Sequence, residues 1–253
     1  MKVFYVIVLV LVAGAVPSHG RTESEGTVFN KTQSHESMNN VTVSNIKLVP
    51  YGNSYLVMQW PRSFCNSRSI YQIPCYYQQV PDRFTVHGLW PQTKSGGGID
   101  CTNRCIYGNY PLFECSQLCP RLVPLLNTYW PDLTSSENNN ERFWGTEYNK
   151  HGSCTFRNQN DYFELTLTVV EGLGISRIGG GPIIIPGYYY WPIEIKRAVQ
   201  KVTNKMPRLK CITVGTTIQL LEISFCVDQN GNVLDVCKGV LDCGNWKVYL
   251  PLP

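Results

Sequence analysis

Runs of apolar and β-branched residues near both ends of the chain have the short length that is typical of β-strands. We expect strands at residues 55–60, 83–89, 217–227, 233–236 and 246–250. Pro61 would end the first strand, since proline cannot donate to a sheet ladder. The Asn230-Gly231 pair between the third and fourth runs favours a tight hairpin turn.

The middle of the chain instead has apolar residues at helical spacing. In residues 113–130, leucines and Trp130 recur every three or four positions. Pro120 and Pro124 predict that this helix is kinked or begins late. Further helices, the first of them ending at a glycine, are expected at residues 141–151, 161–173 and 193–202.

Glycine-rich or irregular stretches separate these elements and predict loops. They cover residues 94–98, 135–140, 179–182 and the aromatic segment 188–192. The chain has no internal repeat. Strands first, helices in the middle and strands last argue for an α+β domain with an antiparallel sheet.

The first 48 residues differ in pattern from the rest. Met1 to Gly20 has a charged start, an apolar run and small residues at its end, as in a secretory signal peptide. The apolar run is shorter than the roughly 20 residues that a membrane span needs. Residues 21–48 are polar and predict a flexible arm. We therefore expect a secreted or endomembrane protein without a membrane anchor, whose one folded domain covers residues 49–253.

Eleven cysteines fit the oxidising compartment that a signal peptide implies. Because the number is odd, at least one is free or pairs with another chain. Cys101, Cys105, Cys115 and Cys119 could together hold zinc as thiolates. Disulfides are nevertheless favoured in a secreted chain.

The charge of the chain restricts its function only weakly. The formal net charge is +4. This balance permits a polyanionic substrate, but ordinary solubility charge explains it more simply. Sequons at Asn30 and Asn40 fit the secretory route and could carry glycans if they are exposed.

Two of the four histidines, His87 and His151, lie in similar surroundings, each followed by glycine and close to aromatic residues. On a helix, Glu147, Lys150 and His151 would share a face, since they lie three or four positions apart. The carboxylate would orient the imidazole and favour its charged form. The lysine could neutralise charge on a phosphorane. Two imidazoles on opposite sides of a phosphodiester could cleave RNA as base and acid without a metal.

Each segment also has a simpler interpretation. The second could be a solvated helix face with a glutamate–lysine pair and a packing histidine. His87 could be a hydrogen-bonded core residue of its strand, although Gly88 leaves room for a ligand or backbone near the ring. Trp90 could stack on a base or belong to the core.

Together, the two segments are much more specific than either alone. Residues 84–91 (Phe-Thr-Val-His-Gly-Leu-Trp-Pro) and 143–154 (Phe-Trp-x-x-Glu-Tyr-x-Lys-His-Gly-Ser-Cys) closely resemble the two active-site segments of the ribonuclease T2 family. The resemblance continues in Gln59-Trp60-Pro61 with Cys65, in residues 223–228, in Cys237 and in Cys243-Gly244. It covers residues 55–250 in the expected order.

The resemblance implies an endoribonuclease that cleaves single-stranded RNA by cyclising phosphoryl transfer, without a metal or another cofactor. His151 would act as base on the ribose 2′-hydroxyl, and His87 would protonate the departing 5′-oxygen. Glu147 and Lys150 would support the phosphorane. One neutral and one protonated imidazole give a bell-shaped pH profile. The need for a 2′-hydroxyl means that DNA would resist.

Substrate contacts and disulfides are also implied by the resemblance. The substrate-binding side chains would be Gln59, Trp90, Gln92 and Thr146. The implied disulfides are Cys65–Cys75, Cys211–Cys243 and Cys226–Cys237, together with a bond from Cys154 to a cysteine of the Cys101–Cys119 group, for which Cys101 is favoured. The pairing of Cys105, Cys115 and Cys119 stays open. The implied fold is α+β, an antiparallel sheet with helices packed around it, stapled by disulfides.

Two positions depart from the family pattern. Many members carry a third histidine, thought to bind phosphate, where this chain has Thr146. A hydroxyl donates a hydrogen bond but brings no charge, so we expect weaker substrate binding rather than loss of chemistry. Gln92 stands where many members have an acidic or asparagine residue at the base pocket, which leaves the base preference open.

The absent third histidine, the basic balance and residues 208–211 resemble the plant self-incompatibility ribonucleases of the style. Such an enzyme would act on RNA in pollen tubes, is expected to be a monomer and could meet pollen F-box proteins. The alternative is a secreted or vacuolar ribonuclease for nutrient recycling or defence. A catalytically silent storage or binding protein is less favoured, because such relatives usually lose an active-site histidine and both are present here.

Overall fold

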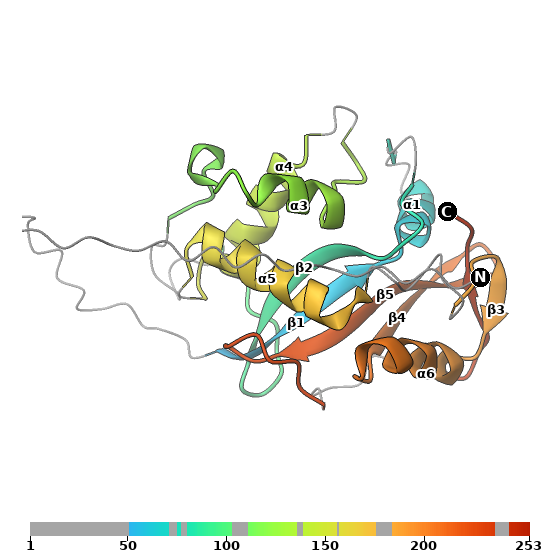
Figure 1. The fold of residues 1–253 in the computed structure, drawn as a ribbon. Helices are drawn as coiled ribbons and strands as arrows, with labels where there is room; N and C mark the ends of the chain where they lie inside the picture. The colour runs from blue at the N-terminus through green and yellow to red at the C-terminus, as the bar shows by residue number, and fades with distance from the viewer. Residues whose placement is uncertain are drawn as a thin grey trace, which may run out of the picture. The chain divides into compact units, whose positions relative to one another are not determined.

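The strands of the computed structural model form one six-stranded sheet in the order β2-β1-β5-β6-β3, with β4 also paired to β5 (Figure 1). Their bounds are β1 Tyr51–Gln59, β2 Thr85–Thr93, β3 Tyr188–Tyr190, β4 Arg208–Val214, β5 Thr217–Val227 and β6 Val248–Leu250. Neighbouring strands are antiparallel, except that β5 and β6 are parallel. The predicted α+β class with a mainly antiparallel sheet is confirmed.

The structure describes residues 51–70, 75–76, 80–102, 111–135, 139–155, 157–175, 184–235 and 243–253, all within one compact unit, Ser44–Pro253. The predictions that lie outside these residues are the signal peptide, the arm at 21–48, the sequons at Asn30 and Asn40, the loop at 179–182 and part of the loop at 135–140. Within the described part, no helix is long and apolar enough to cross a membrane.

The first two strands extend beyond their predicted bounds. β1 begins at Tyr51, and β2 continues to Thr93, so His87 lies inside β2 rather than at its end. β2 also contains Pro91. This is tolerated because, among the described strands, β2 pairs only with β1, and a proline facing away from that partner removes no ladder hydrogen bond.

Two strands, β3 and β4, are absent from the sequence prediction. β3 lies in the aromatic segment predicted to be a loop, and its Tyr189 pairs with Tyr249 of β6 at a ring-centroid distance of 4.9 Å. Conversely, the predicted strand at 233–236 contributes, in its described part, one bridge between Val227 and Val233. There Asp228 accepts hydrogen bonds from the backbone of the turn, which takes the place of a longer ladder.

The described helices are α1 Pro61–Ile70, α3 Val123–Tyr129, α4 Glu141–Glu147, α5 Gln159–Leu173 and α6 Pro192–Thr203, with short turns η1 Cys115–Gln117 and η2 Tyr148–Gly152. α3 begins late, as predicted, with Pro124 in its first turn. Asn158 caps α5 by accepting a hydrogen bond from the Asp161 N–H, and Gly174 ends it with a φ of 61°. α1 is missing from the prediction, because Pro61 both ends a strand and starts a helix.

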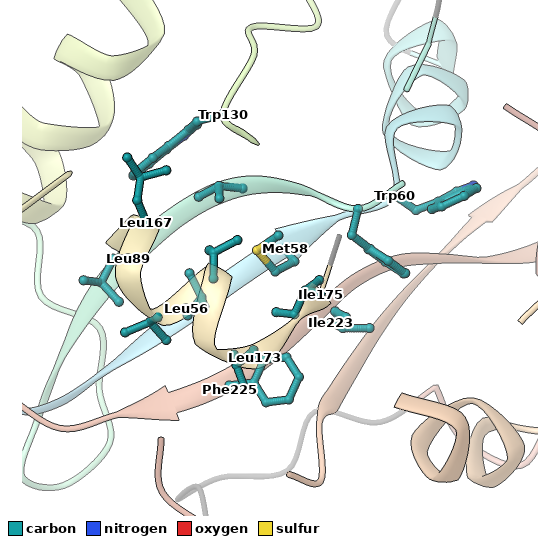
Figure 2. Packing of buried hydrophobic residues seen from close by; sticks show 14 of the residues in the cluster. Leu56, Met58, Trp60, Leu89, Trp130, Leu167, Leu173, Ile175, Ile223 and Phe225 are labelled. Atoms are coloured by element: carbon teal, nitrogen blue, oxygen red, sulfur yellow. The ribbon is translucent and has the colours of Figure 1, made fainter. Parts of the chain in front are cut away.

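Helix α5 packs across one face of the sheet and forms the main core with it (Figure 2). Leu167 and Leu173 of α5 lie over Leu56 and Met58 of β1 and Phe225 of β5, all of them buried. Burial of each such side chain contributes roughly 1.5–3 kcal/mol. This core holds in place the strands that carry the candidate site.

Two buried tryptophans connect the core to His87. Trp144 of α4 donates its Nε1–H to the carbonyl of Trp130 at 2.8 Å. Trp130 in turn donates to the carbonyl of His87 at 3.1 Å. These bonds hold the backbone of β2 at His87 against α4, the helix that ends at Glu147.

Three described disulfides join Cys65 to Cys75, Cys101 to Cys154 and Cys211 to Cys243, which are pairings that the resemblance implies. Cys226 is also disulfide-bonded, and Cys237, its expected partner, lies outside the described residues, as does Cys105. Among the described cysteines, Cys115 and Cys119 are free. Because Cys101 is bonded to Cys154, the four-thiolate zinc set considered from the sequence is not formed.

Candidate active site

A cavity of about 670 Å³ opens beside the middle of β2. The predicted site residues in its wall are Gln59, His87, Thr146 and Glu147. The predicted site residues outside its wall are Trp90, Gln92, Lys150 and His151. The cavity therefore brings together one predicted histidine and the predicted carboxylate, but not the second histidine.

His87 is bound to a carboxylate that is absent from the sequence prediction. Its Nδ1 lies 2.8 Å from Oε1 of Glu222, and Oε2 of Glu222 accepts a hydrogen bond from Lys210 at 2.9 Å. Burial alone would raise the pKa of Glu222, but the hydrogen bond and charge of His87, together with Lys210, lower it below its usual value. Glu222 is therefore ionised beside His87.

Glu147 ends α4 and has a side chain almost fully removed from solvent. Its Oε2 accepts a hydrogen bond from Nε1 of Trp90 at 2.9 Å. Burial raises the pKa of Glu147, although the charges of His87 and Lys150 and the bond from Trp90 act in the opposite direction. A carboxyl group with a raised pKa can take part in proton transfer closer to neutral pH.

Gly88 makes the approach of Glu147 possible. A Cβ at this position would collide with Oε2 of Glu147 and with the indole of Trp90. The space beside His87 that the sequence suggested for a ligand or backbone is therefore filled by a carboxylate and an indole. The glycine after His87 brings β2 and the end of α4 together.

The helix that carries the second histidine changes its hydrogen bonding at Glu147. α4 ends there, and Tyr148–Gly152 continue as the π-helix η2 rather than as the predicted α-helix. A π-helix closes i→i+5 bonds and has more residues per turn than an α-helix, so the α-helical spacing used in the sequence prediction does not apply to these residues. Glu147 reaches the cavity, while Lys150 and His151 do not.

His151 is buried in a different environment from His87. Its Nδ1 is buried and has no hydrogen-bond partner among the described residues. Burial, followed by the charge of Lys150, lowers the pKa of His151 to about 4, although Asp100 and the backbone of Ile99 act in the opposite direction. The imidazole is therefore neutral at neutral pH, and the carboxylate that acts on it is Asp100 rather than Glu147.

Trp90 contacts both imidazoles. Its ring centroid lies 5.0 Å from that of His87 and 5.3 Å from that of His151. Gln92 is buried and donates a hydrogen bond to the carbonyl of Trp90 at 3.1 Å instead of facing the cavity. The indole is thus the physical link between the two histidines.

Several residues of the cavity wall are absent from the sequence prediction. Phe64 and Arg68 come from the unpredicted helix α1, and Arg142 and Phe143 come from α4. Arg142 precedes Thr146 by four positions, and Thr146 Oγ1 donates to its carbonyl at 2.8 Å. That helical spacing could have placed Arg142 beside Thr146. The two arginines bring positive charge to the wall that contains Thr146.

Three groups of the site are suited to proton transfer. They are the His87 imidazole paired with an ionised carboxylate, the His151 imidazole kept neutral by burial, and the buried carboxyl group of Glu147 in the same cavity as His87. Such an arrangement is typical of enzymes that use general acid–base catalysis. The fold and the site therefore define the class of protein: a disulfide-stapled α+β enzyme with acid–base groups on β2, α4 and η2.

The chain matches the model of the Ribonuclease T2 family over residues 51–238. It is 34% identical over 199 residues to ribonuclease S-2 of Pyrus pyrifolia, covering 76% of this chain and 83% of that protein. It is 29% identical over 219 residues to ribonuclease T2 of Sus scrofa, covering 78% and 96%. The structure of the self-incompatibility associated SF11-RNase of Nicotiana alata superposes with a TM-score of 0.61 at 28% identity, covering 79% and 99%.

The match to the family model includes both histidine segments, one on β2 and the other on α4 and η2. The chain belongs to the Ribonuclease T2 family, and it is an endoribonuclease of that type.

Proposed function

We propose that the enzyme cleaves single-stranded RNA by metal-free transesterification, with His151 as base and His87 as acid. The observation that carries this proposal is the opposite electrostatic environment of the two histidines. His151, with a pKa of about 4, is a neutral proton acceptor near neutral pH. His87 has the ionised Glu222 at Nδ1, and a carboxylate there is a favourable partner for an imidazolium.

In the first step, His151 takes the proton of the ribose 2′-hydroxyl as its oxygen attacks phosphorus. His87 gives its proton to the departing 5′-oxygen, which leaves a 2′,3′-cyclic phosphate. The roles reverse when water opens this ring. Both imidazoles contact Trp90, so a nucleotide bound at the indole would lie within reach of both. DNA lacks the attacking hydroxyl and should not be cleaved.

Another observation favours Glu147 as a second candidate for the base. Glu147 shares the cavity wall with His87, whereas His151 does not. Burial also raises the pKa of Glu147. In the two-histidine scheme, Glu147 and Lys150 would instead stabilise the phosphorane.

Alanine and amide substitutions separate the two schemes. A general acid or base contributes about 10²–10⁴-fold, so kcat should fall by that factor in His87→Ala and in His151→Ala, with a smaller loss in Glu147→Gln. Cleavage of a polyuridylate substrate measures these effects, and circular dichroism checks the fold. Glu164→Gln, which removes an exposed partner of Arg121, is the matched control.

Near-normal kcat in His151→Ala, combined with the full loss in Glu147→Gln, would transfer the role of base to Glu147. Loss of cleavage on adding EDTA would overturn the metal-free mechanism. Cleavage of an all-deoxy strand would rule out attack by a 2′-hydroxyl.

We further propose that Arg68 and Arg142 bind substrate phosphate in place of the third histidine found in many relatives. The hydroxyl of Thr146 already donates to the Arg142 carbonyl. Gln59 Oε1, which is buried in the cavity wall without a partner among the described residues, would accept a hydrogen bond from the substrate. Trp90 would stack on a base, and Gln92 would act by holding the Trp90 backbone.

For the biological role, we propose a secreted self-incompatibility ribonuclease of the style. Its signal peptide would end near Gly20, and its catalytic domain would cover residues 49–253. Similarity to ribonuclease S-2 and to SF11-RNase supports this role. As such an enzyme, it would act as a monomer, carry glycans at Asn30 and Asn40 and meet pollen F-box proteins. Transcripts confined to the style would support the proposal, whereas induction in starved or wounded leaves would favour scavenging or defence.

A further inference from the structure

Glu222 lies on β5 between two neighbouring strands. In the sheet register it is opposite Gln59 of β1 and Lys210 of β4. Residues opposite each other in adjacent strands project on the same face, so these three side chains stand side by side. His87, from the next strand β2, reaches the same carboxylate.

Both oxygens of Glu222 are engaged. Oε1 lies 2.8 Å from Nδ1 of His87, and Oε2 lies 2.9 Å from Nζ of Lys210. The exposed fractions of the three side chains are 6% for Glu222, 24% for His87 and 44% for Lys210. A buried carboxylate is unfavourable unless it is paired, and here two partners keep it ionised. Lys210, Glu222 and His87 therefore form a series of contacts that runs from the half-exposed lysine on β4 to the cavity.

An ionised carboxylate at Nδ1 requires hydrogen on that nitrogen and fixes the plane of the ring. Nε2 is then the nitrogen left to exchange a proton with the substrate. Without the carboxylate, the ring could turn over and the two nitrogens could exchange their places. The proton-transfer atom of His87 is therefore selected by a residue 135 positions away in the sequence.

We propose that Glu222 is a positioning residue for RNA cleavage, which holds His87 with Nε2 available to the departing 5′-oxygen. Lys210 shares the charge of Glu222 and so sets how strongly the carboxylate stabilises the protonated ring. The inference rests on the proposed function, since it concerns the proton that His87 donates.

Other titratable or charged groups also face His87 and stay constant in the test variants. They are Glu147 on α4, His151 on η2 and, around the cavity, Arg68, Asp132 and Arg142. A change that follows only from Glu222 or Lys210 can therefore be assigned to the chain of contacts behind His87.

Two substitutions should move the pH–rate profile in opposite directions. Glu222→Gln keeps an oxygen at Nδ1 but removes the negative charge, so the imidazolium is less stable and the high-pH limb of kcat should move to lower pH. Loss of the carboxylate that orients a metal-bound histidine costs about 10–100-fold, and we expect a loss of this order here in kcat, with KM unchanged. Lys210→Met removes a positive charge, so the same limb should move to higher pH.

A purely structural role would lower stability in both variants without moving the limb in opposite directions. Unshifted limbs in both would therefore overturn the proposal. If Glu222→Gln does not fold, Lys210→Met at the half-exposed position still tests the proposal, because its high-pH limb should move to higher pH. Glu164→Gln, at the exposed pair with Arg121, is the charge-matched control and should leave the profile unchanged.

The outcome for His87→Ala separates this inference from the proposed function. Retained cleavage in His87→Ala would refute the acid role itself. An inactive His87→Ala combined with normal cleavage and a normal pH–rate profile in Glu222→Gln would refute only the positioning role. Ring ¹⁵N resonances give a readout without RNA. When the His87 ring is neutral, they should show its proton on Nδ1. In Glu222→Leu, the preference for the Nδ1-protonated tautomer should be lost.

Discussion

Two imidazoles with the same intrinsic chemistry have opposite environments in this enzyme. His151 is buried beside Lys150, and its pKa falls to about 4. His87 is bound through Nδ1 to the ionised Glu222. Both rings are followed by a glycine, but burial and the adjacent Lys150 act on His151, whereas the fold brings Glu222 from a distant strand to His87.

The buried His151 should make the stability of the protein depend on pH. Its pKa in the folded protein is about 4, below the ordinary 6.5. Between these values the unfolded chain binds a proton that the folded chain does not. The free energy of unfolding should therefore fall as the pH drops from about 6.5 to about 4, by up to about 3 kcal/mol.

Urea unfolding across this pH range measures the effect, with His151→Gln as the comparison. Glutamine cannot be protonated, so the variant should depend less steeply on pH. The same dependence in both proteins would show that His151 is not the group responsible.

At the residue scale, local sequence motifs were sufficient to predict some residues of the site. They led to Gln59, His87, Thr146 and Glu147, which share one cavity. They could not lead to Glu222, because its contact with His87 depends on the register of β1 and β5. Sequence spacing carries no information on that pairing.

At the scale of elements, the site depends on the close approach of β2 to the end of α4. The indoles of Trp130 and Trp144 connect the two elements by hydrogen bonds to backbone carbonyls, and Glu147 meets Trp90 across Gly88. The approach requires a residue without a side chain at Gly88, because a Cβ would collide with both groups.

Gly88→Ala should therefore push β2 and α4 apart. Inserting a methyl group into a packed site costs about 1–3 kcal/mol, which thermal or urea unfolding will measure. RNA cleavage should fall as well, since Glu147 and Trp90 must move. Gly98→Ala is the control, because a Cβ there meets nothing within 4 Å. Equal stability of the two variants would contradict the close approach.

The regular spacing of apolar residues predicted the longer helices and strands well. β5 has the expected bounds, and α5 and α6 begin and end within two residues of expectation. The π-helix η2 could not be foreseen, because an α-helical period fits the same residues. α1 was missed because Pro61 was interpreted only as the end of a strand, and β4 was missed because polar residues interrupt its apolar run.

At the scale of the whole molecule, the net charge of +4 is too small to identify a nucleic-acid enzyme. What matters is where the charge lies. Arg68 and Arg142 stand in the cavity wall from two different helices, whereas Arg121 is exposed and paired with Glu164. Composition could not separate these positions, and only the fold places the first two in the cavity wall.

The salt dependence of binding should reveal this distribution. Each phosphate contact on a single strand releases counterions and contributes about −0.7 to the slope of log K against log salt concentration. Arg68→Gln and Arg142→Gln should each make the slope less steep by about that amount, while Arg121→Gln should leave it unchanged. A deoxyribo-oligonucleotide, which would not be cleaved, allows equilibrium binding to be measured by fluorescence anisotropy. Equal slopes in all three variants would mean that the cavity arginines do not contact phosphate.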